Sequence, residues 1–241
     1  MLPARPGSAV AAAAAVPHHV QVGPARRSTY HHGNLPAALT DAATEMARSG
    51  GPDAVVLRAA ARAAGVSAAA AYRHFADHGE LLSAVRHRAL EALAAAMRAS
   101  LESGEPLADP AQESVRRLRA LGSAYIGFAL GDPGLFRTAF CRPDQPVADV
   151  TAQVAAHGPF ALLSGVLDEL VEHGVLDPGR RPGAEIPVWS AVHGLATLLL
   201  DGPLALLPPA ERAAAIDRTS DFVLNGITGP PPAAARPPDG G

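Results

Sequence analysis

Apolar residues recur every three to four positions through most of the chain, and this periodicity restricts the fold more than any other feature. A stripe at this spacing covers one face of an α-helix, whereas no segment of useful length alternates apolar and polar residues as a half-buried strand does. Glycine and proline interrupt the periodicity, for example at 50–52 and 131–133. The sequence therefore predicts an all-α protein.

The periodic segments are separated clearly enough to give individual helices. The pattern predicts nine, over about 35–48, 56–64, 68–75, 80–99, 115–128, 135–140, 147–173, 187–200 and 209–226. Asn34 and Ser67 precede the first and third helices, where their side chains can cap a backbone amide. Pro159 falls inside the seventh and is expected to kink or split it near Gly158. The Ala-, Pro- and Gly-rich ends, 1–24 and 229–241, are expected to be disordered tails.

Composition limits the setting more than the chemistry. The single cysteine, Cys141, permits no internal disulfide and favours a reducing, cytoplasmic environment. The apolar run 9–16 is short for a signal peptide, and no run reaches the roughly 18 apolar residues of a membrane-spanning helix. The net charge is −3, yet nine arginines face six acidic residues between Arg26 and Arg98. Arginine pairs well with phosphate, although so small an imbalance does not by itself establish nucleic-acid binding.

Residues 57–75 have the layout of a helix-turn-helix. The small Ala61 lets two helices cross closely, and Gly65 can take the left-handed conformation that ends the first of them. Val66 is expected to be buried at the turn, and Ser67 can cap the second helix. This spacing indicates a module that places a short helix in the major groove of DNA.

The same segment resembles the DNA-binding domain of the TetR family, whose third helix ends in a tyrosine-x-x-phenylalanine signature, here Tyr72 and Phe75. Residues 30–35 resemble the entry to the first helix in one branch of that family. Residues 189–194 resemble the tryptophan, histidine and glycine motif in the C-terminal domain of the same branch. The resemblance extends over about 29–226.

The resemblance implies a domain organisation. It divides the chain into a disordered tail with a basic arm (1–28), a helix-turn-helix domain (29–77), an effector-binding and dimerisation domain that begins with the fourth helix (78–228), and a disordered tail (229–241). It implies a cytoplasmic, ligand-responsive repressor without enzymatic activity or cofactor. Two copies are expected to pair through the last two helices and to bind a palindromic double-stranded operator.

Residues for DNA contact follow from the resemblance position by position. They are Arg26, Arg27, Ser67, Ala68, Ala69, Tyr72, Arg73, His74 and His78. A solvated charge pair also explains the two arm arginines, and helix capping alone explains Ser67. The helical phase of Arg73 also suits solvent. Phe75 is assigned to the core.

Three departures from the family pattern concern DNA recognition. Alanines at 68–71 offer almost no hydrogen bonds to base edges, so we expect sequence reading to be weak or indirect. Val56 stands where relatives usually have a hydroxyl residue, and His78 stands where they usually have a lysine. Both changes remove phosphate contacts, so we expect binding that is sensitive to salt and weaker than typical.

The resemblance also implies an effector pocket between helices of the C-terminal domain. Its predicted lining is Tyr125, Phe128, Phe136, Phe140, Phe160, Trp189 and His193. Aromatic residues at helical spacing also fit a plain hydrophobic core, and the resemblance favours the pocket. Trp189 and His193 lie four residues apart and should share one helix face.

Other readings of the sequence carry less weight. Histidines 18–19 and 31–32 lack the spaced partners of a metal site, and His193 with Asp201 or Glu185 has no accompanying nucleophile. The alternative from another class is a helical small-molecule carrier or enzyme that has lost DNA recognition, an idea favoured by the alanine-rich third helix. A salt-dependent shift of promoter DNA would discriminate between the two.

Overall fold

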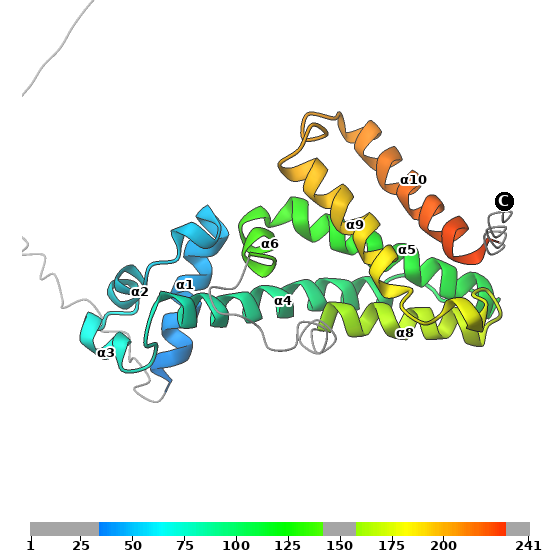
Figure 1. Cartoon of the computed structure of the whole chain (residues 1–241). Helices are drawn as coiled ribbons and strands as arrows, with labels where there is room; N and C mark the ends of the chain where they lie inside the picture. Colours follow the sequence, from blue (N-terminus) through cyan, green and yellow to red (C-terminus); the bar gives the residue numbers. More distant parts are fainter. Residues whose placement is uncertain (1–33, 142–157, 230–241) are drawn as a thin grey trace, which may run out of the picture. The chain divides into compact units, whose positions relative to one another are not determined.

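The computed structural model describes residues 34–141 and 158–229, and all regular structure within these ranges is helical (Figure 1). The elements in chain order are α1 (Leu35–Gly50), η1 (Pro52–Ala54), α2 (Leu57–Ala63), α3 (Ala68–Tyr72), α4 (His78–Glu102), α5 (Pro110–Gly131), α6 (Pro133–Ala139), α8 (Gly158–Glu172), η2 (Pro178–Arg180), α9 (Glu185–Leu200) and α10 (Pro209–Thr228). The predicted all-α class is confirmed. The predicted tails, the histidine pairs, Arg26, Arg27 and the first part of the predicted helix 147–173 lie outside the described residues.

Helix ends differ from prediction where polar caps decide them. The carboxylate of Asp77 accepts the amide N–H of Glu80 at 2.8 Å, and the carboxylate of Glu80 accepts the N–H of Ala76 at 2.7 Å. These two bonds satisfy amides that a helix start leaves without intrahelical partners, so α4 begins at His78 rather than at Glu80. Proline likewise begins α5, at Pro110, because its fixed φ suits a first turn.

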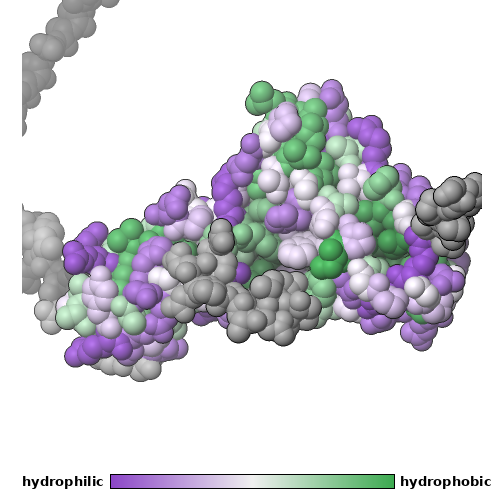
Figure 2. Space-filling view, in the orientation of Figure 1, coloured by the Kyte–Doolittle hydropathy of each residue, from purple (hydrophilic) through white to green (hydrophobic). Residues whose placement is uncertain are grey.

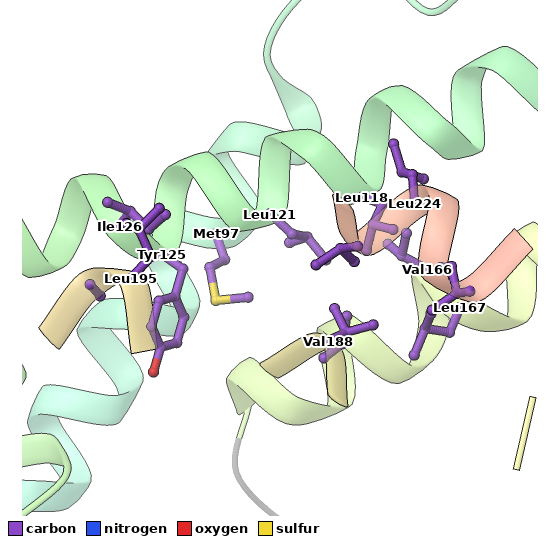
Figure 3. Close-up of a cluster of buried hydrophobic side chains, with 14 of the residues drawn as sticks. Met97, Leu118, Leu121, Tyr125, Ile126, Val166, Leu167, Val188, Leu195 and Leu224 are labelled. Carbon is purple, nitrogen blue, oxygen red and sulfur yellow. The ribbon is translucent and has the colours of Figure 1, made fainter. Parts of the chain in front are cut away.

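The buried side chains of the described residues form two hydrophobic clusters. The head cluster comes from α1, α2, α3 and the first half of α4, together with Leu135 and Ala139 of α6. The body cluster comes from the second half of α4 and from α5, α8, α9 and α10, together with Phe136 of α6. Figure 3 shows side chains of the body cluster turned toward a shared interior. Helices α4 and α6 therefore contribute to both clusters.

The buried face of α1 is rotated slightly from the predicted one. Leu39, Ala43 and Ala47 are fully buried, whereas Ala42 and Met46, which were expected on the core face, are only partly buried at its edge. The reason is that α1 packs against both α2 and α4, so its buried face points between them. Small alanines on that face permit the close approach.

Helix α6 touches α1 at very close range. Gly134 has no side chain, and a Cβ there would lie 2.3 Å from the carbonyl oxygens of Ala47 and Arg48. An ion pair holds the same junction, since Nε of Arg48 donates to Asp132, the N-cap of α6, at 2.8 Å. At the other end of α6, Arg137 binds the carboxylate of Asp201 with two hydrogen bonds.

Helices α9 and α10 are anchored differently. The guanidinium of Arg181 binds Asp168 and Ser164 of α8 and Glu185 in the first turn of α9, which ties the start of α9 to α8. Helix α10 follows after the turn 201–208, and its main contacts are with α5 and α9 (Figure 1). It is therefore the less enclosed of the two helices.

The Gly134 contact predicts a specific loss of stability. Gly134→Ala should lower the free energy of unfolding by about 1 to 3 kcal/mol, because the new methyl group collides with backbone atoms of α1 that cannot give way. Gly131→Ala, where no atom lies within 4 Å of the added Cβ, is the matched control. Urea denaturation measures both, and equal stabilities would contradict the close contact between α6 and α1.

Candidate functional site

The turn between α2 and α3 has the geometry that a helix-turn-helix requires. Gly65 has a φ of 71°, and its N–H donates to the carbonyl of Arg62 at 3.1 Å. The N–H of Val66 donates to the carbonyl of Ala61 at 2.9 Å. This pair of bonds is a Schellman motif, which closes α2 and redirects the chain. Val66 is half-buried against the head cluster rather than fully buried as predicted.

Helix α3 has one buried side and one exposed side. The hydroxyl oxygen of Ser67 accepts the N–H of Ala70 at 3.2 Å and so caps the helix as predicted. Ala71 and Phe75 are buried in the head cluster, which confirms the core assignment of Phe75. Tyr72 keeps 46% of its surface exposed, an unusual amount for a large aromatic residue. The helix thus turns a rigid amphipathic ring outward.

The described residues that were predicted for DNA contact lie close together in the chain around α3. Ser67, Ala69, Arg73, His74 and His78 are exposed like Tyr72, and Ala68 is half-buried. Sequence reasoning passed over two further arginines, Arg58 and Arg62, which are exposed one turn apart on α2. Both arginines lie four residues apart between the apolar positions of α2, and this spacing could have predicted that they share the exposed face of the helix. No side chain caps α2 at Val56, as the missing hydroxyl there implies.

Six of the seven predicted pocket residues form an aromatic cluster packed on itself. Ring centroids lie 4.8 Å apart for Phe140 and His193, 5.0 Å for Phe136 and Phe140, and 5.6 Å for Tyr125 and Phe136. Trp189 joins this cluster through His193 and Phe140, and Phe160 joins it through Trp189. Phe128 stands outside this set and packs, partly buried, against both hydrophobic clusters. Trp189 and His193 do share one face of α9, with centroids 5.9 Å apart.

A short chain of hydrogen bonds runs through the aromatic cluster. The indole N–H of Trp189 donates to the hydroxyl oxygen of Tyr125 at 3.0 Å, and that hydroxyl lies 2.8 Å from Nδ1 of His193. Indole only donates, so the tyrosine O–H is left to donate to His193, which fixes its proton on Nε2. Burial raises the pKa of Tyr125 and lowers the pKa of His193, so both groups are neutral near pH 7.

A partly open cavity lies beside Tyr125 and Trp189, between helices of the body cluster. Its volume is about 50 Å³. Its lining comes from α4, α5, α8, α9 and α10: Met97, Leu118, Arg119, Leu121, Gly122, Tyr125, Pro159, Leu163, Val188, Trp189, Val192, Ser220, Val223 and Leu224. Of the predicted pocket residues, only Tyr125 and Trp189 line it. The aliphatic majority was missed because aliphatic side chains at helical spacing look the same whether they fill a core or border a cavity.

Two features of the described residues concern other kinds of function. Among these residues, no three or more histidine, cysteine, aspartate or glutamate side chains are grouped so that they could hold a metal ion. None of the helices within the same ranges is long and apolar enough to cross a membrane.

A helix-turn-helix with an exposed second helix, joined to a helical body with a cavity between its helices, is typical of DNA-binding transcriptional regulators. Residues 39–85 match the model for bacterial regulatory proteins of the tetR family, and residues 118–223 match the model for the tetracyclin repressor-like C-terminal domain. The chain belongs to the TetR family and is a DNA-binding transcriptional regulator. The second match includes the segment 189–194 on which the resemblance partly rested.

Several solved structures have the same fold, and the match to each covers nearly the whole of that relative. A protein of unknown function from Rhodococcus sp. RHA1 is 30% identical, with a TM-score of 0.67, and the match covers 83% of this chain and 98% of that one. The TetR family regulator PfmR from Thermus thermophilus is 22% identical, with coverage of 77% and 93% and a TM-score of 0.52. The transcriptional regulator FadR from Bacillus subtilis, in complex with stearoyl-CoA, is 16% identical, with coverage of 80% and 98% and a TM-score of 0.56. No curated protein matches the chain.

The Schellman turn predicts that Gly65 tolerates no β-branched side chain. Gly65→Val should abolish DNA binding by misorienting α3, because a residue with a Cβ at positive φ costs about 1 kcal/mol and a β-branched one costs more. Space is not the obstacle, since no atom lies within 4 Å of the added Cβ. Gel-shift titration measures the binding, with circular dichroism to show that the body remains folded. Normal operator binding by the variant would overturn the assigned turn.

Burial of His193 predicts a pH-dependent stability. Its pKa is lowered on folding, so the unfolded chain takes up the proton more readily. The free energy of unfolding should be constant above about pH 6.5 and fall as the pH drops below that value toward the folded pKa. His193→Gln should show a smaller fall in urea titrations between about pH 8 and about pH 5.5. The same substitution at the exposed His173 is the control, and equal slopes for His193→Gln and the parent would contradict the argument.

Proposed function

We infer that this regulator is a cytoplasmic, ligand-responsive repressor that binds a palindromic operator as a homodimer and has no enzymatic activity. The observation that carries this proposal is the exposed side of α3, held by the Schellman turn at Gly65 and presenting Tyr72, Arg73 and His74. Tyrosine and histidine can donate to phosphate oxygens, and arginine can bind them bidentately. The alanines before them can touch only thymine methyl groups.

The dimer interface is assigned to α9 and α10. Exposed apolar side chains gather on these helices, with Ile186 54%, Leu198 43% and Phe222 74% exposed. Figure 2 shows further hydrophobic surface at the turn that joins the two helices. The buried stripe of α9, which includes Leu195 and Leu199, packs in the body cluster of its own protomer. The proposed dimer interface, called the seam below, therefore uses the other side of the helix. A twofold dimer places its two heads about 34 to 36 Å apart on DNA.

The cavity beside Tyr125 and Trp189 is the proposed effector site. It lies between helices of the body and has an apolar lining with a few polar groups, as small-molecule sites do. The Bacillus subtilis relative with stearoyl-CoA supports the idea that a body of this fold accommodates a ligand. The effector of this chain is a small molecule still to be identified.

Helix α6 offers a path from the effector site to the head. Phe136 of α6 packs in the aromatic cluster with Tyr125, while Leu135 on the same helix is buried in the head cluster. The ion pair between Asp132 and Arg48 joins α6 to α1. A ligand that moves the Tyr125 side of the cavity would therefore shift α6 and the head with it, and this shift would change the separation of the two heads in the dimer.

Binding to the chain's own promoter region is the direct test of the function. Purified protein should shift a fragment from upstream of its own coding sequence in the presence of excess unrelated DNA, and the affinity should fall steeply as salt rises. Gly65→Val is the negative control for recognition through α3. A chain that dimerises and binds small molecules but shifts no DNA would favour the alternative, a helical carrier or enzyme on the same fold.

The basic arm predicts a change in the salt dependence. Replacing both Arg26 and Arg27 with Ala should weaken binding to operator and to unrelated DNA alike, and it should flatten the slope of log affinity against log salt by about one to two units. The physical reason is that fewer counterions are released when phosphate contacts are lost. Gel shifts or fluorescence anisotropy at several salt concentrations give the slope, and an unchanged slope would remove the arm from the interface.

A further inference from the structure

Every polar side chain that lines the cavity already has a partner in the protein. Arg119 pairs with Asp221 at 2.5 Å, and the hydroxyl of Ser220 donates to the carbonyl of Ile216 at 3.0 Å. Trp189 and Tyr125 are bonded to each other. A charged ligand group would lose its hydration without finding an unpaired partner inside, which is costly. The lining chemistry therefore favours an uncharged, apolar ligand.

The cavity is too small for such a ligand without movement of its walls. Its volume is about 50 Å³, whereas sites for drug-sized molecules measure roughly 300 to 1,000 Å³. Helix α10 packs mainly on α5 and α9, and Arg180 donates to the carbonyls of Gly226 and Gly229 at its C-terminal end. Its link to α5 beside the cavity is the ion pair between Arg119 and Asp221, two side chains 41% and 56% exposed. Exposed ion pairs are weak, so the position of α10 depends mainly on its buried apolar side chains Val223, Leu224 and Ile227.

The same wall also borders the surface assigned to the dimer. A groove of about 290 Å³ runs between α9 and α10 on the outside of the body, lined among others by Ala191, Phe222 and Ile227. Val188 and Val223 line both this groove and the cavity beside Tyr125. One layer of side chains therefore separates the effector site from the groove. Because packed side chains transmit displacements, a change on one side of the layer reaches the other.

We propose that the cavity takes an uncharged apolar effector, which is accommodated by a small outward movement of α10, and that filling it weakens the association of two copies by displacing Val188 and Val223. This inference rests on the proposed function, since it assumes that the cavity is the effector site and that α9 and α10 form the seam. Linkage requires the reverse effect as well: dimerisation must weaken effector binding by the same factor.

The ligand class is tested with two fluorescent probes of similar size. The neutral 1-aminoanthracene should bind with a saturable rise in fluorescence, and the anionic 1-anilinonaphthalene-8-sulfonate should bind at least tenfold more weakly. Gly122→Leu adds an isobutyl group to the cavity wall and should weaken the neutral probe at least tenfold. Gly127→Leu, exposed on the same helix with open space around it, should not. Preferred binding of the anionic probe, or equal binding to both variants, would overturn the assignment.

The coupling is tested by measuring the dimer dissociation constant with fluorescence-detected sedimentation. Saturating 1-aminoanthracene should raise this constant at least tenfold, and Gly122→Leu should raise it without any probe, while Gly127→Leu leaves it unchanged. The apparent affinity for the probe should also fall as protein concentration rises. Thermal melting of both variants separates coupling from general destabilisation. An unchanged or lower dissociation constant with saturating probe would overturn the coupling.

The position of the seam has its own test. Phe222→Arg, in the groove, should make the chain monomeric, and Leu107→Arg, at an exposed apolar position between α4 and α5, should leave it dimeric. A Phe222→Arg variant that stays dimeric would contradict the proposal that the groove between α9 and α10 forms the dimer interface. Failure of the proposed function looks different: the protein would then show probe binding and linkage yet shift no promoter DNA. Operator binding with no linkage would overturn this inference alone.

Discussion

The shared burial of α4 and α6 is the constraint on which the rest of the structure depends. The first half of α4 packs in the head cluster and its second half in the body cluster, and α6 divides its side chains in the same way. Phe128 and Phe140 pack against both clusters. Neither cluster can therefore rearrange without changing the surroundings of these two helices. A regulator needs this property, because a change in the body is useful only if the head responds to it.

Features with a local physical cause were predictable from the sequence. The Schellman turn needs a residue that tolerates positive φ, and Gly65 stands where the pattern of buried and exposed residues requires it. Ser67 caps α3, and Phe75 is buried, both as expected. The errors concern properties that depend on several helices at once. The face that α1 buries depends on the crossing of α1 with α2 and α4, and the start of α4 depends on two carboxylate caps that hydrophobic periodicity does not contain.

The effector region shows the limit of such reasoning most clearly. The aromatic residues were recognisable, and all of the predicted ones except Phe128 do gather in one place. They pack on each other, however, and the cavity lies beside them, lined mainly by aliphatic residues of five helices. Whether an aliphatic side chain fills a core or borders a void depends on gaps between helices that differ by a single methyl group, and no sequence pattern records these. The hydrogen bonds that join the uncharged side chains of Trp189, Tyr125 and His193 also form only because α5 and α9 lie side by side.

The two ion pairs at the ends of α6 have a consequence for the cell. Arg48 with Asp132 and Arg137 with Asp201 involve partly exposed side chains, so dissolved ions compete with both. When a bacterium loses water under osmotic stress, its internal salt concentration rises, and both ion pairs are weakened together. The same rise weakens phosphate contacts on DNA. The ion pairs of α6 and the proposed arginine–phosphate contacts of the regulator thus depend on one variable, the salt concentration set by the hydration state of the cell.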